Sequence, residues 1–277
     1  MSARLRASVV TLLAVAACGG SHEDATPPPP DAAATRAESS SESSSASVPK
    51  GPKEPRGPID PAKVGTITGV VRFEGDPPVR KPISSGGTGG CPEHAPTLSE
   101  DSIVENGCLA NVFVTIQNGL QGWDVPPAKG ESVSMDQKGC TYVPHVLGLR
   151  VGQTVLVRNS DPTTHNVNIR SRINDALNPI QPPGGLPIEW KPAKKEIGVS
   201  FECNLHPWMK AWVCVVDHPW FAVTGSDGKF VLQGVPPGEY VVEAWHEKFG
   251  KKTAKAIVAP GGSPDASFTY KPTDKPR

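Results

Sequence analysis

The sequence has no excess of charge of either sign and no long uninterrupted apolar run. Its 277 residues include 28 Lys and Arg against 28 Asp and Glu, so the formal net charge is zero. A neutral chain without a basic tract lacks the electrostatic surface with which proteins bind nucleic acid. No apolar stretch reaches the length of about 20 residues that a membrane-spanning helix needs. Nucleic acid is therefore not an expected partner, and the chain is not expected to thread a bilayer.

A sustained apolar period of 3.6 residues, which marks amphipathic helices, is also missing. Gly and Pro are instead abundant, with 28 and 31 residues, together roughly a fifth of the chain against a usual ~12%. Short runs of alternating apolar and polar residues are separated by turn residues at a spacing typical of sandwiches and barrels. The pattern predicts an all-β chain with strands over 66–73, 110–116, 146–157, 198–203, 211–216, 229–232 and 240–245.

The start of the chain has the features of an export signal. Two arginines precede an apolar stretch over 7–17, as in a secretory signal peptide. The segment Val15-Ala16-Ala17-Cys18 resembles the bacterial lipobox, whose Cys is acylated and becomes the first mature residue. An ordinary signal peptide with an incidental Cys is the alternative. Because Asp after the Cys typically retains lipoproteins at the inner membrane, Gly19 favours the outer membrane.

Residues 18–62 are rich in Pro and Ser, with four consecutive prolines at 27–30 and the run SSSESSSAS. Such a composition buries too little apolar surface to fold alone. We therefore expect a disordered tether that holds the folded part off a periplasmic or cell-surface membrane.

Four candidate metal ligands stand in two short segments of the chain. His165 follows a valine-rich strand, and Cys203, His206 and Met209 are spaced for a tight loop between two strands. One thiolate, two imidazoles and one thioether are the ligand types of a blue-copper electron-transfer site. Thiolate and imidazole donors in a preset geometry suit both copper oxidation states.

The order His, then Cys-x2-His-x2-Met, resembles the cupredoxin family, with the short ligand loop of amicyanin. The segment Val151–Asn159, followed by His165 and Asn166, also resembles the cupredoxin entry to the first ligand, and the resemblance covers about 110–217. It implies one type 1 copper in a Greek-key sandwich, with a redox protein such as a cytochrome or oxidoreductase as partner. The implied residues are His165, Cys203 and His206 in the trigonal plane, Met209 as the weak axial ligand, and Pro207 and Trp208 at the docking patch.

Other interpretations of these residues remain open at this point. In the plainest of them, Cys203 is half of a disulfide, His206 lies on the surface and Met209 packs in the core. A zinc site is another interpretation, but zinc rarely binds a thioether. None of the seven histidines forms the His-x-His pairs of multicopper oxidases. Since the sequence offers neither an open coordination position nor a substrate pocket, we expect a carrier and not an enzyme.

The C-terminal part resembles a second family. The order Thr224-x2-Asp227-Gly228-x-Phe, followed by Val-Pro-Pro-Gly-x-Tyr240, resembles the carboxypeptidase regulatory-like domain, a small transthyretin-like sandwich. The usual opening of that domain resembles Gly65–Val71, about 150 residues upstream. We therefore expect a cupredoxin-like domain over 63–218 and a regulatory-like domain over 219–277. The strand 64–74 is assigned to either, and the first domain is inserted in the second or in tandem with it. Bacterial proteins of this arrangement are often labelled methylamine-utilisation-like or plastocyanin-like.

The six cysteines divide among three roles. Cys18 is assigned to lipid and Cys203 to copper, which leaves four for the disulfides that exported proteins favour. The resemblance implies a Cys91–Cys140 bridge, and pairing Cys108 with Cys214 is the economical expectation for the rest. A second metal site from Cys91, Cys140, His94 and His145 is the alternative. His218 and His246 are expected to hydrogen-bond within the scaffold.

These observations favour a lipid-anchored blue-copper electron carrier. One alternative is a copper-scavenging lipoprotein that does not cycle the metal. Another is a binding module, acting through its sandwich, in which copper is structural.

Overall fold

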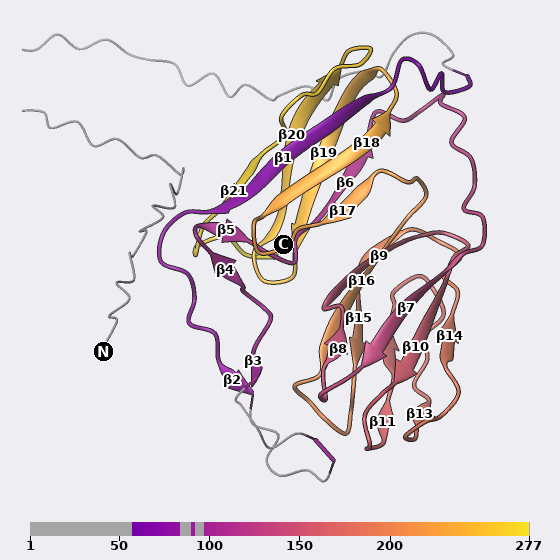
Figure 1. Ribbon diagram of the computed structural model, residues 1–277, viewed down its shortest axis with the longest axis vertical. Helices are drawn as coiled ribbons and strands as arrows, with labels where there is room; N and C mark the ends of the chain where they lie inside the picture. Colours follow the sequence, from indigo (N-terminus) through magenta and orange to yellow (C-terminus); the bar gives the residue numbers. More distant parts are fainter. Residues whose placement is uncertain (1–56, 84–89, 92–96, 277) are drawn as a thin grey trace, which may run out of the picture. The chain divides into compact units, whose positions relative to one another are not determined.

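The computed structural model describes residues 57–83, 90–91 and 97–276, and within these ranges it contains strands and no helix. The all-β prediction is confirmed. The strands form two sandwiches (Figure 1). The terminal sandwich takes its strands from both ends of the described chain, and the inserted sandwich takes the strands between them. Cys18 and nearly all of the expected tether lie outside the described residues.

The terminal sandwich has two sheets that face each other across an apolar core. The first has the order β18-β1-β5-β4, with β21 also pairing with β1: Lys229–Val235, Gly65–Phe73, Cys108–Leu109, Val104–Glu105 and Phe268–Tyr270. The second has the order β17-β6-β19-β20: Phe221–Val223, Phe113–Asn118, Gly238–His246 and Gly250–Val258. In β1, alternate residues including Ile67 and Val71 are buried, because successive side chains of a strand point to opposite faces.

The turn before β18 needs a glycine. Gly228 has a φ of +65°, and a Cβ there would lie 2.5 Å from the backbone oxygen of Val71. Its backbone N–H donates to the oxygen of Gly225 at 3.0 Å, which closes the turn. The turn thereby brings β18 into register beside β1, with Val70 opposite Lys229.

The inserted sandwich also has two sheets around one core. One has the order β14-β10-β7-β8: Ile188–Trp190, Thr154–Asn159, Ser132–Gln137 and Tyr142–Val143. The other has the order β12-β15-β16-β9: Asn168–Arg170, Glu196–Glu202, Lys210–Val216 and Val146–Arg150. Two further pairs lie outside these sheets. One is β11 with β13 (His165–Asn166 and Ile180–Gln181), and the other, upstream of the inserted sandwich, is β2 with β3 (Pro82–Ile83 and Thr97–Leu98).

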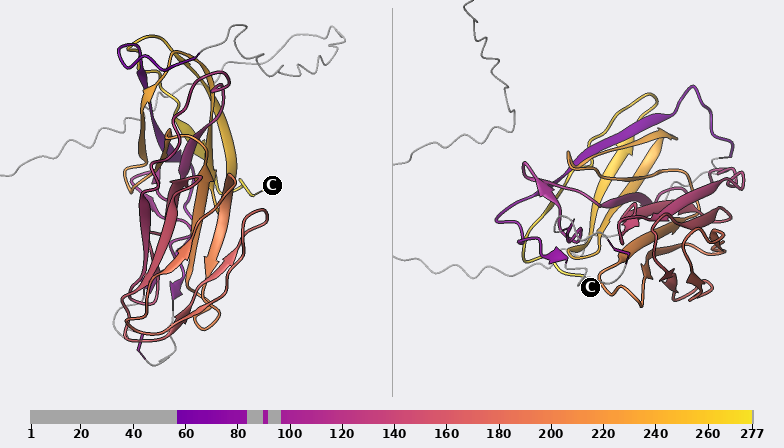
Figure 2. Two further views of the ribbon diagram at one scale, coloured as in Figure 1. Left: turned by 90° about the vertical axis from the view of Figure 1, so that its right-hand side faces the viewer. Right: turned by 60° about the horizontal axis from the view of Figure 1, so that its bottom comes forward.

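The expected domain boundaries do not coincide with the strand pairing. Strands β1 and β4–β6, all upstream of residue 119, belong to the terminal sandwich, and β17 pairs with β6 through Phe221 opposite Thr115. Residues 119–220 are therefore inserted between β6 and β17, two neighbouring strands of the terminal sandwich. The alternating pattern over 110–116 predicts a strand, but it does not tell which sheet the strand joins. In Figure 1 and both views of Figure 2, the indigo and yellow strands from the two ends of the chain lie together.

An aromatic cluster joins the two sandwiches. The Trp212 ring of β16 meets the Trp245 ring of β19 at 5.6 Å. Phe113 and Phe221, both of the terminal sandwich, stack on each other at 5.6 Å and belong to the same cluster. Gly198 forms a bulge in β15, and a Cβ there would lie 2.7 Å from the Trp245 ring. This close approach buries apolar surface between the sandwiches.

A buried ion pair lies at the same junction. His145, just before β9, contacts Glu247, just after β19, through its Nε2, and its Nδ1 lies 3.7 Å from Glu100. Burial opposes protonation, but the hydrogen bond and charge of Glu247, together with Glu100, raise the pKa of His145 above its ordinary value. The junction therefore favours the protonated form of the imidazole, which lies between two carboxylates.

Candidate metal centre

Three of the four expected ligands converge at one end of the inserted sandwich. His165 lies in β11, Cys203 directly follows β15, and His206 lies in the short loop before β16. The Nδ1 atoms of the two histidines are 2.9 Å apart, and the Cys203 Sγ lies 3.9 Å from the first and 3.6 Å from the second. All three residues are buried.

This triangle has nearly the size that one metal ion requires. Metal–nitrogen bonds of ~2.0–2.1 Å and metal–sulfur bonds of ~2.3 Å, at tetrahedral to trigonal angles, separate nitrogen from sulfur by about 3.6–3.8 Å. The two observed nitrogen–sulfur distances lie within a few tenths of an ångström of this range. The nitrogen–nitrogen distance of 2.9 Å is a few tenths shorter than the corresponding separation of about 3.3–3.6 Å.

Met209 is fixed beside these ligands by the backbone of the loop. Its N–H donates to the oxygen of His206 at 2.9 Å, and its oxygen accepts from the Cys203 N–H at 3.2 Å. The side chain is 1% exposed and lies in the same apolar cluster as Cys203. The loop therefore folds so that Cys203 and Met209 face each other across the ends of two paired strands.

A carboxylate that the sequence reasoning missed holds the first histidine. Asp161 accepts a hydrogen bond from His165 Nε2 at 2.9 Å, which leaves Nδ1 for the cluster. The other partners of this carboxylate are the backbone N–H groups of Gly139 and Cys140, at 2.6 and 2.9 Å. Histidine ligands commonly donate their second ring N–H to a carboxylate, which fixes the tautomer and the ring orientation. The only sequence signal was the position of Asp161 four residues before His165.

The Pro-rich excursion over 170–195, the segment between β12 and β15, supports the site through strand pairing and hydrogen bonds. It contributes β13, which pairs with β11 so that Gln181 lies opposite His165. The Gln181 side chain donates to the oxygens of Val157 and Leu186, and its backbone oxygen accepts from Asn159 at 3.1 Å. The excursion thus orders the segment between β10 and His165.

Hydrogen bonds also prepare Cys203 to ionise. Its burial opposes the thiolate, but the contact with His165 and backbone hydrogen bonds, beginning with that of Asn166, lower its pKa below the ordinary value. The Asn166 N–H points at the Sγ at 3.5 Å, and the Asn166 side-chain oxygen accepts from the Asn204 N–H at 2.6 Å. The thiolate is the form that binds a metal.

His206 is packed against a disulfide and an indole ring. Cys91 and Cys140 are bonded to each other, and their Sγ atoms lie within 4.8 Å of a ring nitrogen of His206. The Trp208 ring lies 5.2 Å from the His206 ring and donates its Nε1–H to the oxygen of Cys140 at 3.0 Å. Burial, followed by the charge of His165, lowers the pKa of His206.

The structure corrects two expectations about the cysteines. The Cys91–Cys140 bridge agrees with the resemblance, but Cys108 and Cys214 are free thiols. Cys214 lies fully buried at the junction, where burial raises its pKa to about 12, and Cys108 lies in β5. The bridge also removes the second metal site, since both of its thiols are used. His94 lies outside the described residues, and His145 binds Glu247.

The remaining expected residues are scattered. Pro207 is exposed and Trp208 half-buried, next to Leu205. His218 contacts the oxygen of Ile116 through Nε2 at 2.8 Å, and His246 Nδ1 accepts from the Lys248 N–H, so both histidines bond to the scaffold. Cys18 lies outside the described residues.

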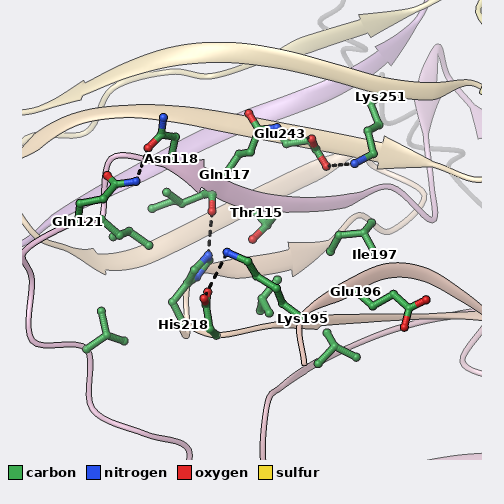
Figure 3. A pocket seen from close by; sticks show the side chains of 16 residues that line it. Thr115, Gln117, Asn118, Gln121, Lys195, Glu196, Ile197, His218, Glu243 and Lys251 are labelled. Carbon is green, nitrogen blue, oxygen red and sulfur yellow. Dashed lines mark hydrogen bonds and ion pairs between the residues drawn. The ribbon is translucent and has the colours of Figure 1, made fainter. Parts of the chain in front are cut away.

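A cleft of about 570 Å³ lies at the junction, away from the metal ligands (Figure 3). It is lined from both sandwiches, at the Val216 end of β16, whereas Met209 precedes the opposite end. Its charges are matched in pairs, Lys195 with Asp217 and Lys251 with Glu243. The remaining carboxylate of the lining, Glu196, accepts hydrogen bonds from the side chains of Ser171 and Asn174.

No protein-family model and no curated protein matches this chain. Among solved structures, the chain is similar to several variants of amicyanin, including a methionine-to-alanine mutant in the Cu(I) form, at 22% identity with a TM-score of 0.28. That match covers 37% of this chain and 97% of amicyanin. A purple cupredoxin from Nitrosopumilus maritimus matches at 22% identity with a TM-score of 0.26, over 30% of this chain and 98% of the other.

A third similar structure is the copper-containing nitrite reductase of Thermus scotoductus SA-01, at 21% identity with a TM-score of 0.29. The match covers 32% of this chain, and the chain spans only 23% of the reductase. Separately, the described part of the chain contains no helix that is long and apolar enough to cross a membrane.

Proposed function

We propose that the inserted sandwich is a cupredoxin that binds one type 1 copper ion and that the protein carries single electrons. The observation that carries this proposal is the convergence of His165 Nδ1, His206 Nδ1 and the Cys203 Sγ in a buried triangle of metal-site size. Met209 supplies the thioether of the set from the adjacent strand end.

The donor chemistry selects copper over zinc. Two imidazoles, one thiolate and a weak thioether are typical of blue-copper sites. Structural zinc sites use Cys and His, and catalytic zinc sites keep an open position for water. His165, Cys203 and Met209 are all buried at this end of the inserted sandwich, which favours a closed site.

The chain's own contribution is to hold these donors in place before and after electron transfer. Asp161 fixes His165, and Asn166 donates to the Cys203 sulfur while tying down the next residue of the loop. Bound copper would supply the one-electron couple. Donors that are already positioned need to move little when the charge on the metal changes, which suits a carrier.

The cellular setting is part of the same proposal. Cys18 would carry lipid, and the tether would hold the folded part at the surface of a bacterial membrane, with the outer membrane favoured. The Cys91–Cys140 bridge supports export, because disulfides persist in oxidising compartments. The proposed partner is a redox protein that docks at Pro207 and Trp208. Trp208 is the ring that packs on His206, which supports this assignment. We propose no catalytic role.

Titration of the metal-free protein with Cu(II) tests the function. We expect one equivalent to produce an intense visible band that a reductant bleaches and an oxidant restores. Cys203→Ser should abolish the band, because the colour arises from thiolate-to-copper charge transfer. Cys108→Ser is the matched control, since that free thiol lies in the terminal sandwich. A colourless protein that holds only Cu(I) would contradict electron transfer and favour scavenging.

A further inference from the structure

Two neighbouring residues of the ligand loop differ sharply in exposure. Leu205 is 52% exposed, whereas His206 is 4% exposed. Both lie in the same short loop between β15 and β16, so the difference does not come from the loop being sunk into the sandwich. His206 is buried because other parts of the chain cover it.

The cover consists of the Cys91–Cys140 disulfide and Trp208. Both bridge sulfurs lie within 4.8 Å of a His206 ring nitrogen, and the Trp208 ring is 5.2 Å away. The indole Nε1–H donates to the oxygen of Cys140 at 3.0 Å, so the disulfide and the indole support each other. Cys91 and Cys140 are themselves 7% and 2% exposed.

The disulfide is anchored to the first histidine as well. The Cys140 N–H donates to the same Asp161 carboxylate that accepts from His165 Nε2. On the other side of the bridge, Gly90 has a φ of +94°, and a Cβ there would lie 2.6 Å from the Cβ of Thr163, two residues before His165. The bridge thus fastens the Gly90–Cys91 segment directly over the histidine pair.

We propose that the Cys91–Cys140 disulfide is a positioning element that closes the His206 side of the metal centre. It holds the imidazole in one orientation and keeps water and small anions from reaching the metal by this route. The inference rests on the proposed function, because it takes the site to be a metal centre. The closure of His206 by the disulfide is a property of the metal-free protein as well. The bridge joins positions 49 residues apart in the sequence, so without it Cys91 is held at the inserted sandwich by packing alone.

Histidine modification tests the closure in the metal-free protein. Diethyl pyrocarbonate, with peptide mapping by mass spectrometry, reports how fast His206 reacts. We expect His206 to be protected in the native protein and in Cys108→Ser, and to react about tenfold faster or more in Cys91→Ser/Cys140→Ser, as local opening becomes easier. His218, buried far from the bridge, should keep its rate.

Azide tests the same closure in the Cu(II)-loaded protein. The visible band should be insensitive to azide in the native protein and should shift in the double variant. If the double variant does not fold, the metal-free native protein, reduced with dithiothreitol and desalted under argon without alkylation, replaces it in the histidine-modification experiment. There the bridge is reduced to two thiols while dithiothreitol is oxidised to its cyclic disulfide.

Equal His206 reactivity and equal azide response with and without the bridge would overturn the proposal while leaving the copper site intact. Failure of the native protein to bind copper would instead contradict the proposed function. In that case the modification rates of the metal-free protein still decide whether the bridge closes the site.

Discussion

The two sandwiches differ in how their buried polar side chains are arranged. The core of the terminal sandwich consists of aliphatic and aromatic residues from both of its sheets, including Ile67 and Val242. Its buried polar side chains, such as Thr115, Glu243 and His246, are spread over separate positions of β6 and β19. The inserted sandwich has a similar apolar core, but at one end it also buries a set of hydrogen-bonding side chains: Gln137, Asn159, Asp161, His165, Asn166, Gln181 and His206.

The difference separates a part built for stability from a part built for a site. Apolar burial stabilises a fold without directional requirements. Buried polar groups are costly unless each finds its partner, so a polar cluster survives only with fixed geometry. Since both sandwiches have an apolar core, the polar end of the inserted sandwich is not needed to fold a sandwich. Its geometry fits the metal centre proposed above.

The largest expected effect concerns the terminal sandwich as a folding unit. A chain of residues 221–277 lacks β1 and β6, which pair with β18 and β19 in the intact protein. We expect it to be unfolded or insoluble, because its strands expose unpaired edges. Residues 57–277 should unfold cooperatively. A soluble 221–277 chain with dispersed amide resonances would contradict the interleaved architecture.

A core truncation should separate stability from metal binding. Leu232 is 1% exposed in the terminal core, and Leu232→Ala should cost about 2–5 kcal/mol of unfolding free energy. The copper band of the folded variant should be unchanged, since β18 contributes nothing to the ligand set. Urea unfolding and the visible spectrum measure the two quantities. A weakened band at full folding would show that the sandwiches are coupled more tightly than proposed.

Asp161→Asn should have the opposite effect, because it should weaken metal binding more than it lowers the stability of the fold. Loss of a carboxylate partner of a ligand histidine typically lowers metal affinity about 10–100-fold. We expect that loss in a competition titration with a copper chelator, with little change in the band maximum. Asp136→Asn, which affects a carboxylate that accepts from Ser160 on the sandwich surface, is the control. Equal affinities of the two variants would remove Asp161 from the site.

The smallest effect concerns pH and the junction. His145 has a raised pKa, so its contribution is complete below the ordinary value of 6.5 and is lost as pH rises through the folded value. Glu247 has a lowered pKa, because His145 outweighs the opposing effect of burial, and its contribution fades only as pH falls below 4.5. The metal-free protein should therefore lose stability relative to His145→Gln as pH rises above the ordinary value of 6.5 and through the raised pKa of His145. A parallel pH dependence of the two proteins would contradict the ion pair.

Much of this arrangement could be predicted from sequence because it is local. Period-two alternation predicted strands such as β1 and β18, and spacing placed Cys203, His206 and Met209 on one loop. The misses involve contacts across long sequence separations. Nothing near residue 113 indicated that β6 joins the terminal sandwich. Cys108 and Cys214 were paired by elimination, although pairing depends on distances between strands.

The position of a supporting group was equally hidden. Asp161 has the sequence context of an ordinary turn residue between Ser160 and Pro162, and only the fold brings it to His165 Nε2. The burial of His206 likewise depends on a bridge from Cys91, far upstream of the loop. The proposed ligands of the loop thus follow from local spacing, whereas the orientation of their side chains depends on the tertiary structure.

A crystal structure of the copper-loaded protein, with anomalous differences recorded at the copper edge, tests the central claim most directly. The account predicts one strong peak, bonded to His165 Nδ1, His206 Nδ1 and the Cys203 Sγ, with Met209 as its more distant neighbour, beside an intact Cys91–Cys140 bridge. A peak at the His145–Glu247 junction, or no peak inside the inserted sandwich, would contradict it.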